Sequence, residues 1–190
     1  MIAIKRRRTR QALALGLALL AAPLAASAQM PVSYTEGGRA LFHFEAPDFW
    51  TVRAGGPQEL AGPDADDAPR PVARVIGLEP TAEPHVWMGF VSPVGISDLE
   101  GGVAYLAEIG PHLVKSPEVT RRKDTVLNGM PARVIAGTGR RRGRGVEFTA
   151  TVVDLPNGRV AVSVVVFEAG ANTQLVADVN AVLASLRAAR

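Results

Sequence analysis

Four arginines lie within seven residues of glycine-rich sequence, and they are the one local feature of this chain with a marked electrostatic character. The segment reads Gly139-Arg140-Arg141-Arg142-Gly143-Arg144-Gly145. A guanidinium group binds phosphate, carboxylate or sulfate through paired hydrogen bonds, and the flanking glycines let the backbone adapt. The segment predicts an anion-binding finger at a hairpin tip. The candidate partners are anionic lipid headgroups, a polyanionic glycan or an acidic patch on another protein. The alternative is a solvated loop that keeps the hairpin soluble.

The residues that could perform hydrolysis do not form a catalytic pattern. Ser92 lies in Gly89-Phe90-Val91-Ser92-Pro93-Val94-Gly95, where each glycine stands one position too far from the serine for a nucleophile elbow. No pair of acidic residues has a spacing that fixes two carboxylates for acid-base work. The chain contains no cysteine, which excludes thiolate catalysis, cysteine metal sites and disulfides. We therefore predict a protein without catalytic residues.

The histidines give no metal-binding spacing. His43, His85 and His112 occur singly, without the spacing that places two ligands on one face. A meeting of His43 and His85 across strands, joined by Glu45 or Glu83, is the less favoured alternative. We predict no metal and no cofactor. The enzyme alternative is a small hydrolase whose site is assembled from dispersed polar residues. They would be His43, His85, Glu45 and Ser92.

Two tryptophans fall on short predicted strands. Trp50 and Trp87 supply large packing area in a chain with only 5% aromatic residues. We therefore interpret them as core residues, with an apolar ligand pocket as the alternative.

The second half of the chain predicts the sheet that presents the arginines. Four strand-like runs lie at 119–127, 132–140, 146–155 and 159–167. They are linked by Asn128-Gly129, by the arginine segment and by Pro156-Asn157-Gly158, which predicts an antiparallel meander. The run 146–152 alternates apolar and polar residues, so its strand should have one dry and one wet face. The run 160–167 is almost wholly apolar and should be central, covered on both faces.

Helices and further strands complete the pattern. Short strands are expected at 41–45 and 49–52, and another pair at 72–78 and 86–91. Residues 54–71 are acidic and rich in proline and glycine, which predicts a loop. Ser97 and Glu100 form a capping-box pattern before a helix that should fray or break at Gly110-Pro111. Asn172 predicts the N-cap of a final amphipathic helix that covers the central strand.

The start of the chain predicts export. A basic head runs into the apolar stretch 12–26 and a small-x-small site at Ala26-Ser27-Ala28, the pattern of a cleaved signal peptide over residues 1–28. An uncleaved anchor is less favoured because the stretch is short and contains Pro23. General secretion is favoured over twin-arginine export, because the residues after the arginine pair are polar.

The high isoelectric point belongs to this leader. Removing residues 1–28 takes away five of the 21 basic side chains and none of the 18 acidic ones, which leaves 16 against 18 and a formal net charge of −2. A mature chain of that charge lacks the field needed for nucleic-acid binding.

The residues also resemble a known family. The pattern Phe42-x-Phe44-x-x-Pro47-x-x-Trp50-x-Val52 is followed by Leu127-Asn128-Gly129-Met130-Pro131-Ala132-Arg133, two long strands around Asn157-Gly158 and a closing helix. This pattern resembles the PsbP-like superfamily, including DcrB-type bacterial envelope proteins, over most of residues 42–186. The resemblance implies an α/β/α sandwich on an antiparallel sheet, in proteins that act as binding or accessory factors.

The sequence therefore predicts a single α+β domain over residues 29–190, an antiparallel β-sheet flanked by helices, behind a cleaved leader. It predicts a periplasmic or secreted protein without a transmembrane segment in the mature chain. The expected role is non-enzymatic, as a binding or accessory protein of the envelope. Its expected partner is an anionic envelope component or a protein, engaged through Arg140, Arg141, Arg142 and Arg144.

Overall fold

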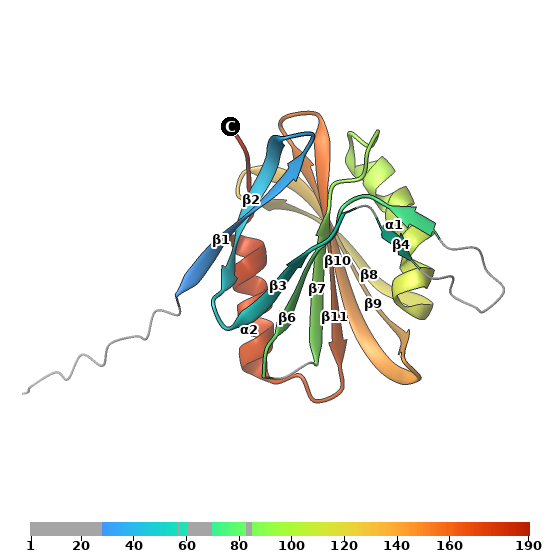
Figure 1. The fold of residues 1–190 in the computed structure, drawn as a ribbon. Coiled ribbons are helices and arrows are strands. Elements are labelled where there is room, and N and C mark those ends of the chain that lie inside the picture. Colours follow the sequence, from blue (N-terminus) through green and yellow to red (C-terminus); the bar gives the residue numbers. More distant parts are fainter. Residues whose placement is uncertain (1–27, 57, 61–69, 83–84) are drawn as a thin grey trace, which may run out of the picture.

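A large antiparallel sheet forms the centre of the molecule (Figure 1). The structure is a computed structural model and describes residues 28–56, 58–60, 70–82 and 85–190. The predicted signal peptide therefore lies outside the described residues except for Ala28. The sheet has the strand order β3-β6-β7-β11-β10-β9-β8. Its strands are β3 (Trp50–Ala54), β6 (Ile76–Pro80), β7 (Val86–Val91), β8 (Lys115–Leu127), β9 (Met130–Arg141), β10 (Arg144–Leu155) and β11 (Arg159–Glu168).

The four strands predicted in the second half are confirmed, and tight turns join the first three. Arg142 and Gly143 between β9 and β10 have φ values of 51° and 79°, and Asn128 and Gly129 between β8 and β9 have 50° and 80°. Positive φ at both central residues matches the type I′ turn, whose twist fits a two-residue hairpin. Asparagine tolerates this conformation and glycine adopts it freely, so Asn128-Gly129 helps to fix the register at the first corner. At the second corner Gly143 suits the turn, whereas Arg142 holds a left-handed conformation that arginine rarely adopts.

A second, smaller sheet packs beside the first. It contains β1 (Gln29–Glu36), β2 (Arg39–Pro47) and β12 (Arg187–Ala188), in the order β1-β2-β12. The predicted strands at 41–45 and 49–52 are confirmed as β2 and β3, which belong to different sheets because the chain turns sharply between them. The predicted acidic loop at 54–71 is not loop throughout: two short paired strands occur in it, β4 (Gln58–Leu60) and β5 (Arg70–Val72), the second of which extends one residue past it. Its three aspartates lie outside the described residues.

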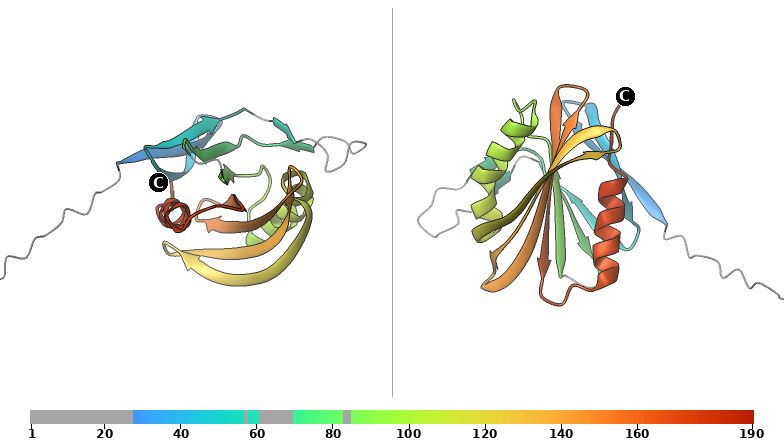
Figure 2. Two further views of the ribbon diagram at one scale, coloured as in Figure 1. Left: turned by 90° about the horizontal axis from the view of Figure 1, so that it is seen from below. Right: turned by 180° about the vertical axis from the view of Figure 1, so that it is seen from behind.

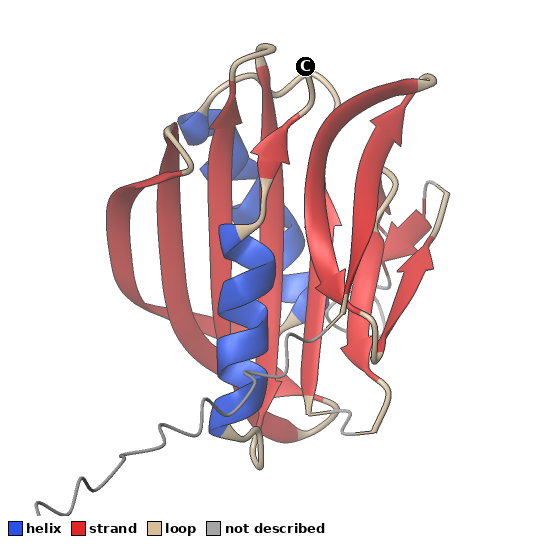
Figure 3. Ribbon diagram, turned by 90° about the vertical axis from the view of Figure 1, so that its left-hand side faces the viewer, coloured by secondary structure: helices blue, strands red, loops and turns tan. Residues whose placement is uncertain are grey.

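The two helices lie on opposite faces of the large sheet (Figure 2). Helix α1 (Leu99–Leu113) packs on β8 to β11, and α2 (Thr173–Ala184) lies on the other face beside β2 (Figure 3). Asn172 caps α2 as predicted, because its side chain accepts a hydrogen bond from the Leu175 backbone N–H at 3.0 Å. The fold is thus α+β, with an antiparallel sheet between helices, as the sequence predicts.

Helix α1 differs from its prediction at both ends. The N-cap is Asp98 and not Ser97: the Asp98 side chain accepts a hydrogen bond from the Gly101 backbone N–H at 2.7 Å. The helix also continues through Gly110 and Pro111 to Leu113. Burial of Leu106 and Ile109 against the sheet outweighs the local cost of these two residues, since tertiary packing supplies most helix stability.

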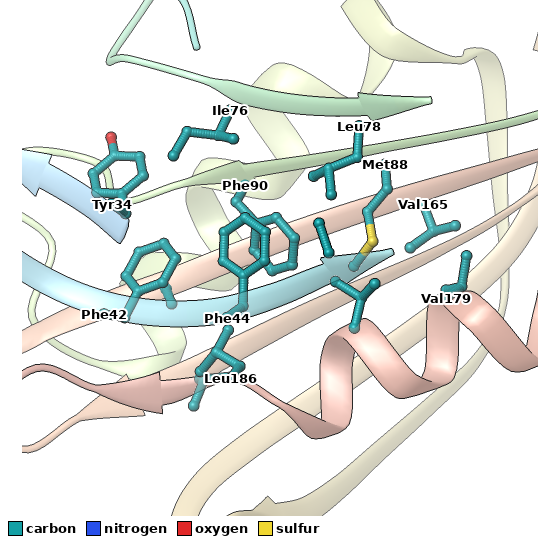
Figure 4. Packing of buried hydrophobic residues seen from close by; sticks show 14 of the residues in the cluster. Tyr34, Phe42, Phe44, Ile76, Leu78, Met88, Phe90, Val165, Val179 and Leu186 are labelled. Atoms are coloured by element: carbon teal, nitrogen blue, oxygen red, sulfur yellow. The ribbon is translucent and has the colours of Figure 1, made fainter. Parts of the chain in front are cut away.

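Each face of the large sheet carries its own hydrophobic core. On the α2 side, aromatic rings from both sheets stack, with the Phe44 and Phe90 ring centroids 4.2 Å apart (Figure 4). On the α1 side, valines from β10 and β11 pack against Leu106 and Ile109. Residues 160–166 of β11 are all buried, which confirms that this strand is central.

Strand β10 has one dry and one wet face only over its first part. Glu147 is exposed, but Thr151, expected on the wet face, is 5% exposed. The core on the α2 side, which contains Val153 and Leu155, closes over this end of the strand, and the alternation of residue types alone does not predict that cover.

Candidate functional site

The arginine segment forms the tip of the β9–β10 hairpin, at the end of the sheet opposite the C-terminus (Figure 1). Arg141 pairs with Arg144 across the turn formed by Arg142 and Gly143. Successive side chains of a strand point to opposite faces, so Arg140 and Arg141 point away from each other. The four guanidinium groups therefore do not form one cluster.

Arg141 lies on the α1 face and packs on an aromatic ring. Its guanidinium carbon is 5.2 Å from the centroid of the Trp87 ring, a cation–π arrangement. Burial lowers the pKa of the Arg141 guanidinium, and the neighbouring charge of Arg142 lowers it further. An arginine keeps its proton under these conditions, so Arg141 is a charged group held against the protein surface.

Two glycines make room for this ring. A Cβ atom at Gly89 would lie 2.5 Å from a ring carbon of Trp87, and one at Gly77 would lie 3.6 Å from the Trp87 indole nitrogen. The ring lies flat across neighbouring strands because these positions carry no side chain. The sequence contains no local signal for this pairing other than the glycines at positions 77 and 89.

Arg144 has a partner as well. Its guanidinium lies 3.7 Å from a carboxylate oxygen of Glu168, whose side chain is 12% exposed while that of Arg144 is 72% exposed. An ion pair at this distance and exposure contributes little to stability. It does, however, offset part of the charge of Arg144.

Arg140 and Arg142 are the two arginines that remain available. Both are exposed, and neither forms an ion pair with any residue that the structure describes. Lys115 of β8 stands opposite Arg140 in the register and adds a third basic side chain to this side of the tip. We use the term basic tip for Lys115, Arg140 and Arg142.

The residues of the enzyme alternative do not converge. His85 and Ser92 flank β7 at its two ends, about 23 Å apart at roughly 3.3 Å per residue. His43 lies in the smaller sheet, where its Nδ1 is 2.8 Å from the Ser33 hydroxyl. Glu45 forms an ion pair with Arg187. Ser92 is fully buried and offers no exposed hydroxyl.

The positions of the histidines, acidic residues and tryptophans support neither a metal site nor a ligand pocket between Trp50 and Trp87. Across the described stretches of the chain, no three histidine, aspartate or glutamate side chains gather as metal ligands would; Glu83 lies outside those stretches. Trp50 is 3% exposed in the core on the α2 side, whereas Trp87 packs on the α1 side. The two tryptophans therefore do not line a common pocket.

Comparison with known proteins identifies the fold. No family model matches the chain, and no curated protein matches it. The solution structure of cyanobacterial PsbP (CyanoP) from Synechocystis sp. PCC 6803 is similar with a TM-score of 0.50 and 11% identity, over 88% of this chain and 96% of that one. The chain therefore has a PsbP-like fold, as its sequence resemblance predicts.

Two further solved structures match the chain with lower TM-scores. LpqN of Mycobacterium tuberculosis, a protein involved in cell envelope biogenesis, has a TM-score of 0.49 and 17% identity, over 86% of this chain and 91% of its own. A protein from Bacteroides thetaiotaomicron has a TM-score of 0.46 and 8% identity, over 79% of this chain. The present chain spans only 46% of that protein's length.

Neither α1 nor α2 nor any other helix within the described residues is long and apolar enough to cross a membrane.

Proposed function

We propose that this chain is a non-catalytic accessory protein of the bacterial envelope, which docks on an anionic membrane surface through its basic tip. In this proposal residues 1–28 direct export and are removed. Residues 29–190 then act as one PsbP-like domain in the periplasm or outside the cell. The sequence pattern of the leader supports the address, and the PsbP-like fold is compatible with an accessory role.

The observation that carries the proposal is the free pair Arg140 and Arg142. Other arginines of the chain hold the fold together: Arg133 binds Asp124 and Glu100, and Arg159 binds Glu36. Arg140 and Arg142 have no such partner among the described residues, and they stand on a hairpin held by a tight turn. Two unpaired charges on a rigid hairpin can bind a partner, and within the described part of the chain they form no ion pair that would stabilise the fold.

The shape of the tip favours a membrane surface over a small anion. Arg140 and Arg142 are exposed at a projecting turn and do not line a cleft. A protruding cation gains from a surface that presents many anionic headgroups, by about 1 kcal/mol for each lysine or arginine near it. Because the net charge of the mature chain is close to zero, this attraction is local and should fall steeply with salt.

Sedimentation with lipid vesicles tests the proposal. The processed protein, purified after export, is mixed with vesicles that contain phosphatidylglycerol or with vesicles of phosphatidylcholine alone, at low and high sodium chloride. We expect binding only to the anionic vesicles at low salt. The double change Arg140→Gln and Arg142→Gln should weaken it roughly thirtyfold, because it removes about 2 kcal/mol of attraction.

A matched control removes two charges from the other end of the molecule. Arg39 and Arg190 are exposed and lie near the β1–β2 turn and the C-terminus, opposite the tip (Figure 1). Arg39→Gln with Arg190→Gln makes the same change in net charge and should leave binding within twofold of the unchanged protein. Equal losses in the two double variants, or binding that ignores salt, would overturn the proposal. Retention of the protein by peptidoglycan but not by vesicles would do so as well.

A further inference from the structure

A cavity of about 120 Å³ lies between α1 and the strands β8, β9 and β10. Its walls are almost entirely apolar. They include Leu106 and Gly110 of the helix, and Val119, Ile135, Phe148 and Ala150 of the strands. An enclosed apolar cavity of about 150 Å³ binds a molecule the size of benzene. The space under α1 is open at its edge, where Val119 and Arg122 are exposed, so it suits part of an apolar chain whose remainder extends along that edge.

The course of α1 explains why this space exists. At Gly102 the helix touches the sheet so closely that a Cβ atom would lie 2.4 Å from a Val152 methyl carbon. At Gly110, two turns further on, nothing lies within 4 Å of the position that a Cβ would take. The sheet meanwhile bends around the helix, because β8 carries two register shifts against β9 (Figure 2). The helix therefore touches the sheet at Gly102 and leaves an open space beside Gly110, while Ile109 and Val114 remain buried against the strands.

One charged side chain stands in this apolar wall. Arg122 of β8 lines the cavity and is exposed, and it forms no ion pair with any part of the chain that the structure describes. An apolar cavity with a single cation at its edge is complementary to an amphiphile that has one apolar tail and one anionic head. The cation selects the charge of the head, and the walls accept methylene groups.

We propose that this cavity binds the acyl chain of a single-chain anionic amphiphile such as a fatty acid, with its carboxylate at Arg122. The tail enters at the exposed edge formed by Val119 and Arg122 and packs against Ile135 and Phe148. The site stands apart from the membrane docking proposed above: Arg122 does not belong to the basic tip, and neither proposal requires the other.

Methyl NMR spectroscopy with dodecanoate as the probe tests this site in the processed protein. We expect saturable shifts of the methyl signals of Leu106, Val119 and Ile135, and none for core residues on the α2 side such as Leu78. Dodecanol should bind several-fold more weakly and dodecyltrimethylammonium more weakly still, since only the carboxylate gains from Arg122. Shifts confined to other methyl groups, or equal affinity for the three probes, would overturn the proposal.

Variants of the cavity make the test specific. Ala150→Leu fills the cavity from the sheet side and should reduce dodecanoate affinity at least tenfold. If this variant fails to fold, Gly110→Leu fills the cavity from the helix side, where the position is open, and the same reduction is expected. Normal affinity in a folded filling variant contradicts the site.

The charge at the cavity edge has its own control. Arg122→Gln should weaken dodecanoate several-fold and leave dodecanol unchanged. Arg121→Gln removes the same charge from the neighbouring position, which does not line the cavity, and should leave both unchanged. Equal effects of the two changes would overturn the role of Arg122. The variant Arg140→Gln with Arg142→Gln should lose vesicle binding and keep dodecanoate binding, so the two proposals fail separately.

Discussion

The contact between Arg141 and Trp87 gives one of the four neighbouring arginines a different environment from the others. Strand alternation turns Arg141 toward the α1 face, where it packs on the Trp87 ring and carries a pKa lowered by burial. Arg140 points the other way, and Arg142 occupies the turn. The arginines that are adjacent in sequence therefore have different roles, and only Arg140 and Arg142 remain for a partner.

Gly89 tests this arrangement at the residue scale. Gly89→Ala should lower the free energy of unfolding by about 1–3 kcal/mol, because the new methyl group displaces the Trp87 ring and overpacking costs that much. Chemical denaturation gives the value, and tryptophan fluorescence of the folded state should change with it. Gly145→Ala is the control, because nothing lies within 4 Å of that position, and it should be close to neutral. A neutral Gly89→Ala would mean that the ring does not lie over β7.

At the element scale, α1 is held by packing more than by its own sequence. It contains Gly101, Gly102, Gly110 and Pro111, all poor helix formers, and only Gly102, Leu106 and Ile109 are buried in it. The helix contacts the sheet closely at one end and leaves the cavity at the other. Gly102 and Gly110 consequently have opposite roles: Gly102 permits the close contact, and Gly110 borders the cavity.

Alanine substitutions at these two glycines separate the roles. Gly102→Ala should destabilise the protein by about 1–3 kcal/mol, since its methyl group would meet Val152. Gly110→Ala should stabilise it by roughly 0.5–1 kcal/mol, because the position is open and alanine favours the helix. Thermal unfolding of both variants measures the difference. Effects of the same sign would contradict the close contact at Gly102 and the open space at Gly110.

Much of the element order could be predicted from local signals. Strands β8 to β11 carry alternating or continuous apolar runs between turn residues, and Asn172 marks the start of α2. Strand β1 was not predicted, because among its eight residues only Tyr34 is buried and Pro31 interrupts the run. The length of α1 was underestimated for a related reason, since the burial that sustains it comes from strands distant in sequence.

The candidate site was predicted in part. Asn128-Gly129 and the glycines around the arginines placed the basic residues at a hairpin tip, because these residues suit two-residue turns. The division of the four arginines depends on which face each one occupies and on Trp87 and Glu168 from other strands. The cavity depends on the distance between a helix and a curved sheet. Neither property can be read from a local pattern of residue types.

At the scale of the whole molecule, the exposed side chains of Arg140 and Arg142 lie at one end of the large sheet. The C-terminus and the β1–β2 turn lie at the other end (Figure 1). Docking through the basic tip therefore predicts an orientation: the tip faces the membrane, and the β10–β11 turn at Pro156 faces away from it.

A single fluorescent label tests this orientation most directly. The chain contains no cysteine, so Gly145→Cys beside the tip, or Pro156→Cys at the far turn, provides one labelling site for an environment-sensitive dye. On mixing with vesicles that contain phosphatidylglycerol at low salt, the dye at position 145 should shift its emission to the blue, and the dye at position 156 should not change. A shift at position 156 alone, or equal shifts at both positions, would contradict docking through Arg140 and Arg142.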